Sequence, residues 1–483
     1  MAKLKNIVKQ LSLNDYQFIY SSLEESGAGK SAHLIKSLRE RNISDEQIMR
    51  ELEVNPNAYY TLRSRLNQKI EEYLIQRIES PRTDLLKKVA NIMELAFTRK
   101  HAIAVATLKK LEKELIDYDL FNELMIVYKI LKKLHIHTDE YYTYSQLYNK
   151  HVALMLALDK AEDVMGSYFK KFGEYSLGGD TDDYLQLELL YREIRNINAI
   201  HQSHRLYVYQ SCVSVFHRLY VQEQPSDMED DPIDVMLKKS QRIFKTYPKD
   251  ALYFHLELVF GYLNFAYHDR IGNDSKAEEC YEEVNDRATV LLSNYSWYTY
   301  PTQFLQVKMS RAIDAGQAHT LAAEADVMFE GFVGDENNFA HYLNYQTYRA
   351  LADHHAGRYN DARQRLNDLL NHTTIKKYPY ALLECKALLA VTYVMLREED
   401  LFHQLVGSIQ RQIRLLGKRE CWHVVVLIKL LKTALSPTKR DRQKKIAVLV
   451  KQFEQVPRKL FSPTAHLTFT TDFVENMCVP SEH

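Results

Sequence analysis

Residues 344–371, NYQTYRALADHHAGRYNDARQRLNDLLN, contain two stretches of helical periodicity separated by one glycine. Small residues lie on both stretches, and Gly357 falls where the first helix must end and the chain must reverse. Small side chains where two helices cross let their backbones approach, and a tyrosine beside the turn fills the remaining space. The segment predicts an antiparallel helical hairpin whose packing positions are Ala350, Ala352, Gly357, Tyr359, Ala362 and Leu366.

Weaker copies of this pattern occur earlier in the chain. Residues 92–115 contain its small residues without its glycine. Residues 262–285 keep four of its positions, namely Ala266, Gly272, Ala277 and Tyr281. The pattern resembles the tetratricopeptide repeat (TPR), which has a small residue on each helix with Gly and Tyr around the turn. That family's tryptophan and closing proline are missing, so the repeats are degenerate. The resemblance covers residues 85–435 and implies a TPR-like solenoid, with an irregular α-solenoid of another kind as the alternative.

Helical periodicity also dominates the rest of the chain. In residues 103–116 the apolar side chains recur at Ile103, Val105, Leu108, Leu111, Leu115 and Ile116. The 14 glycines and 11 prolines are too few for a fold rich in tight turns. The 33 tyrosines suit shallow grooves between helices, because each packs a ring and leaves a hydroxyl for water or a partner. We therefore predict an all-α fold, with an N-terminal helix-turn-helix-like head followed by a degenerate TPR-like α-solenoid.

Charge and cysteine content limit the classes of function. Lys plus Arg and Asp plus Glu number 63 each, so any attraction for nucleic acid must come from a local patch. The five cysteines are scattered and never have CxxC spacing, which is typical of reduced thiols in a cytoplasmic protein. The first 18 residues lack the apolar core expected of a signal peptide, and no run of about 18 apolar residues occurs. We expect a cytoplasmic protein with no membrane partner.

Residues 43–70, ISDEQIMRELEVNPNAYYTLRSRLNQKI, predict a different helix pair. Ser44 and Gln47 have the spacing of a capping box at the start of the first helix. Asn55 followed by Pro56 is typical of a second helix start. A short break containing Val54 separates the two helices, which is the layout of a helix-turn-helix.

This stretch is similar to the DNA-binding helix pair of response regulators and promoter-reading sigma factors. In that pattern the core positions are Ile48, Leu52, Val54, Tyr59 and Leu66. The resemblance implies that the second helix contacts DNA through its outward side chains, Asn57, Tyr60, Thr61, Arg63, Ser64, Arg65 and Lys69. Three cations and no acid occur between Asn55 and Ile70, a local surplus that suits contacts with phosphates.

Two positions depart from the pattern of this family. Met49 stands where the family usually has a small residue, and Glu53 stands where it usually has glycine. A methionine can flex into the available space, whereas Glu53 must adopt the turn without the conformational freedom of glycine. The first helix also brings Glu46, Glu51 and Glu53 close to where DNA would run. The alternative is that the pair serves only for packing or oligomerisation.

Other segments lack the residues that catalysis or metal binding requires. Residues 25–34, ESGAGKSAHL, resemble the end of a phosphate-binding loop, but position 24 is Glu instead of Gly and the preceding residues have helical spacing. We expect Gly27 and Gly29 to end one helix and Ser26 or Ser31 to start the next. The histidine pairs at 135 and 137 and at 354 and 355 do not share a helix face. We expect no cofactor, no metal and no enzymatic activity.

The patterns divide the chain into three segments. Residues 1–80 form the head, residues 81–436 the TPR-like solenoid, and residues 437–483 a basic break, a short helix and a tail. Within the tail, LTFTTDF at 467–473 alternates in a way typical of a short strand or an extended segment. We expect the tail to pack along the final helices and cap the solenoid.

Two functions fit this organisation. The first is a regulator resembling bacterial cytoplasmic proteins in which a repeat domain senses a peptide or protein and controls a DNA-binding head. The second is an interaction or assembly scaffold in which the head only caps the solenoid or dimerises. Both imply a peptide or protein ligand in the groove of the solenoid, because stacked hairpins form a continuous concave surface. DNA is a partner only in the first, and oligomerisation is compatible with both.

Overall fold

The structure is a computed structural model of the 483-residue chain. It describes residues 13–40, 45–76, 81–178, 181–222, 231–248, 250–288, 303–329, 336–436 and 442–478, with the single residues 4, 7, 8, 11 and 292. All regular elements in these ranges are helices, which confirms the predicted all-α class. No helix in these ranges is both long enough and apolar enough to cross a membrane.

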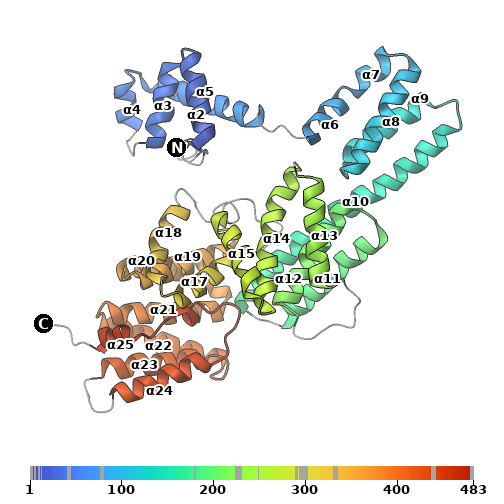
Figure 1. Ribbon diagram of the computed structural model, residues 1–483. Coiled ribbons are helices and arrows are strands. Elements are labelled where there is room, and N and C mark those ends of the chain that lie inside the picture. Colours follow the sequence, from blue (N-terminus) through green and yellow to red (C-terminus); the bar gives the residue numbers. More distant parts are fainter. Residues whose placement is uncertain are drawn as a thin grey trace. The chain divides into compact units, whose positions relative to one another are not determined.

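The chain forms two compact units, Met1–Ser145 and Gln146–His483. The first unit begins with four described helices (Figure 1), α2 (Leu13–Glu25), α3 (Gly29–Glu40), α4 (Asp45–Glu51) and α5 (Pro56–Gln76). Their inward faces share one apolar core, which includes Ile19, Leu23, Leu34, Ile35, Ile48, Tyr59, Leu66 and Ile70. Each of these buried side chains contributes about 1.5–3 kcal/mol by leaving water. The three segments predicted from the sequence stay a prediction.

The glycine-containing stretch between α2 and α3 is a helix-to-helix turn. Gly27 has a φ of +70°, and the amide of Ala28 donates to the carbonyl of Leu23 at 2.9 Å. This left-handed closure is the one that glycine favours at a helix end. The prediction was wrong for Gly29 and Ser31, because Gly29 is the first residue of α3 and Ser31 lies within it. One left-handed residue completes the reversal, so α3 starts earlier than expected.

The first unit continues with α6 (Pro81–Ala90), α7 (Ile92–Thr98), α8 (His101–Asp117) and α9 (Phe121–Leu134). Helices α8 and α9 form a hairpin, and α6 and α7 pack against both. The buried residues of α8 are Ala104, Leu108, Leu111 and Leu115. Ile103 and Ile116, which the periodicity places on the apolar face, are exposed. Leu108, Leu111 and Leu115 are buried as predicted, and Ala104 is buried where the periodicity places Ile103.

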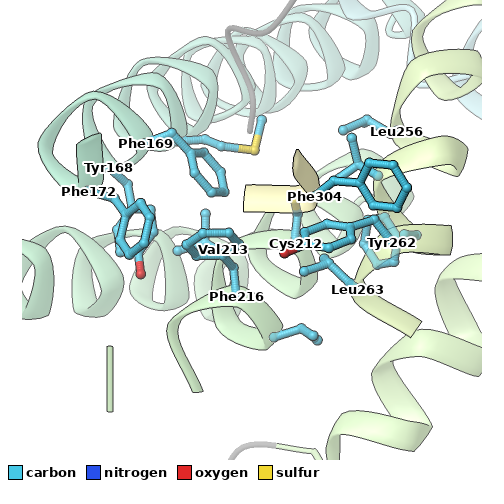
Figure 2. Close-up of a cluster of buried hydrophobic side chains, with 14 of the residues drawn as sticks. Tyr168, Phe169, Phe172, Cys212, Val213, Phe216, Leu256, Tyr262, Leu263 and Phe304 are labelled. Atoms are coloured by element: carbon cyan, nitrogen blue, oxygen red, sulfur yellow. The ribbon is translucent and has the colours of Figure 1, made fainter. Parts of the chain in front are cut away.

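Helix α10 (Glu140–Gly178) spans the boundary between the two units. The second unit continues with α11 (Thr181–Ile200), α12 (His204–Tyr220), α13 (Ile233–Thr246), α14 (Ala251–Arg270) and α15 (Asp274–Asp286). Figure 2 shows part of the aromatic core of these helices, in which the rings of Phe169 and Phe172 meet Phe216 edge to face. The ring centroids lie 5.1 Å and 4.7 Å from that of Phe216, which is a favourable geometry for aromatic pairs.

The second unit then consists of helices packed in tandem. They are α17 (Gln303–Asp314), η1 (Ala318–Thr320), α18 (Leu321–Met328), α19 (Phe339–His355), α20 (Tyr359–Asn371), η2 (Thr373–Lys377), α21 (Pro379–Met395), α22 (Glu399–Leu416), α23 (Trp422–Leu435) and α24 (Arg442–Gln455). Helix α19 packs on α20, α21 on α22, and α23 on α24 (Figure 1). This arrangement is compatible with a helical solenoid.

The hairpin that the sequence predicts at residues 344–371 consists of α19 and α20. Gly357 has a φ of +74° at the end of α19, and the amide of Arg358 donates to the carbonyl of Asp353 at 2.8 Å. Tyr359 is half-buried, with its ring centroid 5.3 Å from that of His354. The remaining packing positions, Ala350, Ala352, Ala362 and Leu366, are all buried.

Residues 457–478 follow α24 and lie against the hairpins; we call this segment the strap. It contains η3 (Pro463–His466) and α25 (Thr471–Cys478). Helix η3 packs against α17, α19 and α21, and α25 packs against α21 and α23. The short strand considered for residues 467–473 does not form. The hydroxyl of Thr470 accepts the amide of Phe473 at 3.2 Å, and this cap starts a helix at Thr471.

Candidate functional site

The turn between α4 and α5 is tight and closed by backbone hydrogen bonds. The amide of Val54 donates to the carbonyl of Met49 at 3.1 Å, and Glu53 adopts a φ of +51°. Glu53 therefore takes the left-handed conformation that glycine adopts at no steric cost. The side chain of Asn55 accepts the amide of Ala58 at 2.8 Å and caps α5 at its first turn. Ser44, the first residue of the predicted capping box, lies outside the described residues.

A polar cluster joins the start of α4 to α5. The hydroxyl of Tyr59 donates to Asp45 Oδ1 at 2.9 Å, and Arg63 Nη1 donates to Asp45 Oδ2 at 2.7 Å. Burial, and then the neighbouring carboxylate of Asp45, raise the pKa of Tyr59 to about 12. The phenol therefore stays protonated and able to donate at neutral pH. The side chain of Arg63 is only 12% exposed, so this predicted DNA contact is occupied in holding the two helices together.

The other predicted DNA contacts lie on the opposite side of α5. Asn57, Tyr60, Thr61, Ser64, Arg65 and Lys69 are all exposed, whereas Tyr59, Leu66 and Ile70 are buried. The hydroxyl of Thr61 donates to the carbonyl of Asn57 at 2.9 Å, and Lys69 Nζ lies 3.5 Å from Ser26 Oγ. At 100° per residue, positions 57, 60, 61 and 64 share the centre of the exposed face, and positions 65 and 69 lie along one edge.

The charge of this face changes along α5. The first four turns carry no acid, but Glu71 and Glu72 are exposed further along the helix. Asn67 donates to Glu71 at 2.6 Å and Gln68 donates to Glu72 at 2.9 Å. A polyanion would therefore be attracted to the first four turns of α5 and repelled by the following turn, which carries Glu71 and Glu72.

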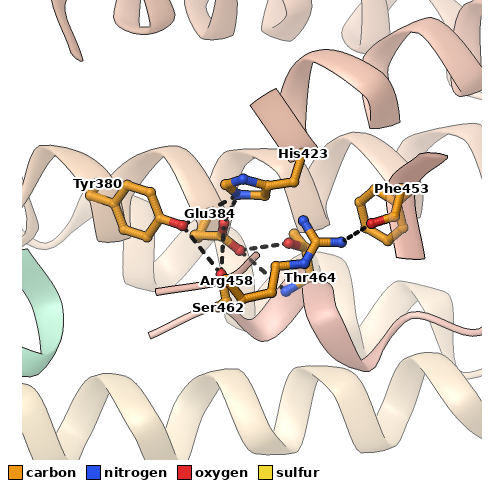
Figure 3. A network of polar contacts seen from close by, with 7 residues as sticks. All are labelled: Tyr380, Glu384, His423, Phe453, Arg458, Ser462 and Thr464. Carbon is orange, nitrogen blue, oxygen red and sulfur yellow. Dashed lines mark hydrogen bonds and ion pairs between the residues drawn. The ribbon is translucent and has the colours of Figure 1, made fainter. Parts of the chain in front are cut away.

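A second polar cluster lies where the strap meets α21 and α23 (Figure 3). Glu384 is fully buried, and its Oε2 accepts both the hydroxyl of Thr464 at 2.7 Å and the amide of Thr464 at 3.2 Å. Its Oε1 accepts the hydroxyl of Ser462 at 3.2 Å and is also bound by His423 Nε2. Burial alone would raise the pKa of Glu384, but the hydrogen bonds from His423 and Thr464 outweigh it and lower the pKa.

This cluster was not predicted from the sequence. Glu384 is the one acid in α21, whose sequence PYALLECKALLAVTYVM is otherwise mainly apolar. An isolated carboxylate among apolar residues was the available signal, because a buried charge needs partners. Those partners, His423 and Thr464, lie 39 and 80 residues away along the chain, so no local pattern identifies them.

Other buried polar groups of the second unit connect helices. Arg205 pairs with Asp250 at 2.8 Å, and His217 links the hydroxyl of Tyr168 at 3.0 Å to Glu188 at 3.1 Å. Within the described ranges, no three His, Cys, Asp or Glu residues are grouped so that they could hold a metal ion.

All five cysteines are free thiols of unequal burial. Cys212, Cys385 and Cys421 are buried, and Cys280 and Cys478 are half-buried. Burial raises the pKa of Cys212 to about 12 and that of Cys421 to about 11, so both are protonated at neutral pH. A protonated thiol is a poor nucleophile.

The chain matches no protein-family model, no curated protein and no solved structure. Its function is therefore inferred from its own residues, and two surfaces carry that inference. One is the exposed side of the first four turns of α5, and the other is the face of the hairpins on which the strap lies.

Proposed function

We propose that the chain is a non-enzymatic cytoplasmic regulator of the bacterial type described above. In this proposal α4 and α5 form a helix-turn-helix that contacts duplex DNA. The tandem hairpins form a TPR-like solenoid that binds a peptide or protein partner. The partner's occupancy of the solenoid would then control the DNA-binding head.

The observation that supports the DNA contact is the two-sided character of α5. One side is buried against the head, while the other presents Asn57, Thr61 and Arg65 to solvent without an acid among the first four turns. Amide and hydroxyl groups near the start of a recognition helix suit base edges in the major groove. Arg65 and Lys69 at the edge of this face suit the flanking phosphates.

The experiment is a titration of the full chain against a mixed-sequence DNA duplex at several salt concentrations. Replacing both Arg65 and Lys69 by Ala is expected to weaken binding and to reduce the slope of log affinity against log salt by about two. The control is the exposed pair Lys109 and Lys113 on α8, which has the same four-residue spacing. Replacing that pair by Ala removes the same charge and is expected to leave the affinity unchanged.

Absence of salt-dependent binding, or equal effects of the two double variants, would contradict the DNA-binding role. The second candidate is then a scaffold whose head contacts protein. Its support is the exposed aromatic surface of the head, where Phe18 is 58% exposed and stacks on Tyr73, and Tyr60 is 53% exposed. Self-association of the chain without DNA binding, measured by analytical ultracentrifugation, would favour that candidate.

A further inference from the structure

The strap covers the first helices of successive hairpins. Helix η3 packs against α17, α19 and α21, and α25 packs against α21 and α23. Three of these helices, α19, α21 and α23, are the first members of their hairpins along the chain, and α17 packs against α19. In a stack of hairpins, equivalent helices line one continuous face, and such faces bind peptides in extended or helical form. The strap supplies both forms, a non-helical stretch at 467–470 and the helix α25.

The hairpins bind the strap through its peptide groups as well as its side chains. Three side chains of the hairpins donate to carbonyl oxygens of the strap. These bonds run from His355 to His466 at 2.9 Å, from Arg397 to Met477 at 2.7 Å and from Arg442 to Cys478 at 3.2 Å. Glu384 also accepts a hydrogen bond from the main chain of the strap, from the amide of Thr464. Hydrogen bonds to the main chain hold a bound peptide whatever its side chains are, while pockets for side chains provide specificity.

Specificity comes from residues 461–464, Phe-Ser-Pro-Thr. Phe461 is buried, and the hydroxyls of Ser462 and Thr464 both donate to the carboxylate of Glu384. A cavity of ≈ 20 Å³ remains between this segment and α17 and α19, which is room for about one water molecule. The fit is therefore close, and two hydroxyls on either side of a proline satisfy one buried acid.

We propose that the face formed by α17, α19, α21 and α23 is a peptide-binding surface, and that the strap is its intramolecular occupant. The surface takes a peptide with an aromatic residue followed by Ser-Pro-Thr, and such a peptide competes with the strap. Departure of the strap alone would leave the Glu384 carboxylate without Ser462 and Thr464, which disfavours an empty surface. Exchange for a peptide with the same donors avoids that cost. This inference rests on the proposed peptide-binding role of the hairpins and places its site.

The test uses the full chain with a specific protease site inserted between Val456 and Pro457, where the strap begins after α24. The probe is a fluorescent synthetic peptide of residues 457–478. After cleavage of the folded chain, the peptide in large excess is expected to replace the strap, whereas the uncleaved chain binds it far more weakly. A peptide with Ser462→Ala and Thr464→Ala should compete about tenfold less well or worse, because both hydrogen bonds to the buried carboxylate are lost.

Two results would overturn the proposal. One is a cleaved chain that keeps its circular dichroism spectrum but never exchanges its strap, which would make the strap a permanent part of the core. The other is equal competition by the native and the doubly substituted peptide. A measurement without cleavage uses Glu384→Gln, which is expected to speed hydrogen exchange in residues 461–478. The matched control is Glu399→Gln at an exposed position, and equal exchange in the two variants would also contradict the proposal.

A chain that exchanges its strap but binds no DNA keeps the peptide surface and loses the DNA-binding role. A chain that binds a partner protein equally well before and after release of the strap keeps the partner-binding role and contradicts the surface assigned here.

Discussion

The two arginines of α5 have opposite environments. Arg63 is 12% exposed and pairs with Asp45, which also accepts the hydroxyl of Tyr59. Arg65, two residues further along, is exposed. Residues two apart on a helix do not face the same side, so one guanidinium belongs to the head's interior contacts and the other to its surface.

This difference predicts that replacement of each arginine by alanine affects a different property. Arg63→Ala is expected to lower the stability of the head by about 1–3 kcal/mol, because the carboxylate of Asp45 loses its charged partner. Arg65→Ala is expected to change stability by less than about 0.5 kcal/mol while weakening DNA binding. Hydrogen exchange of the amides of α5 measures the first effect, and the DNA titration measures the second. Equal stability of the two variants would contradict the assignment of Arg63 to packing.

At the level of secondary-structure elements, the backbone of the α4–α5 turn is strained at one residue, and a substitution there can relieve the strain. Glu53 has a φ of +51°, a conformation that costs a residue with a Cβ about 1 kcal/mol relative to glycine. Glu53→Gly is therefore expected to stabilise the head by about 0.5–1 kcal/mol. The control is Glu51→Gly in the last turn of α4, which is expected to destabilise it by about 1 kcal/mol. Hydrogen exchange in α4 and α5 checks both signs, and a loss of stability in both variants would refute the argument.

Elements were more predictable from sequence than the contacts between them. Periodicity and the glycine at position 357 predict α19 and α20, because both signals are local to the hairpin. The same periodicity places Ile103 on the wrong face of α8, because alanine carries too weak an apolar signal to mark position 104. The outward residues of α5 follow from helical spacing, but the engagement of Arg63 with Asp45 depends on a contact 18 residues away along the chain.

The Glu384 cluster marks the limit of sequence-based inference. Its partners in the strap lie about 80 residues away along the chain, so their contact depends on how the hairpins stack. The alternation of LTFTTDF predicts a short strand or an extended segment, whereas the Thr470 cap and the packing of α25 on α21 and α23 favour the helix.

For the whole second unit, the burial of histidines is expected to make stability depend on pH. His354 is buried, contacts His355, Tyr359 and Phe473, and has a pKa that burial and then His355 lower to about 3. Burial and then His355 also lower the pKa of the half-buried His466, to about 4. In the unfolded chain a histidine titrates near pH 6.5. Between these values only the unfolded chain binds the protons, so stability falls as the pH drops below about 6.5.

Each such histidine is expected to lower the free energy of unfolding by about 1.4 kcal/mol per pH unit. His354→Met should therefore reduce the slope of stability against pH by that amount. Denaturant unfolding of the second unit between pH 7 and pH 5, followed by circular dichroism, measures it. The exposed His319 is the matched control, and His319→Met is expected to leave the slope as it is. An unchanged slope in His354→Met would show that His354 becomes protonated without unfolding.

The five thiols differ in burial, so their rates of chemical modification can report which part of the second unit opens first. Cys478 is half-buried at the end of α25, and its carbonyl is held by Arg442. Cys212, Cys385 and Cys421 are buried. An alkylating reagent is thus expected to modify the half-buried Cys280 and Cys478 first, and the three buried thiols only when the helices that cover them separate. The order of labelling along the chain records which opening comes first, without any engineered probe.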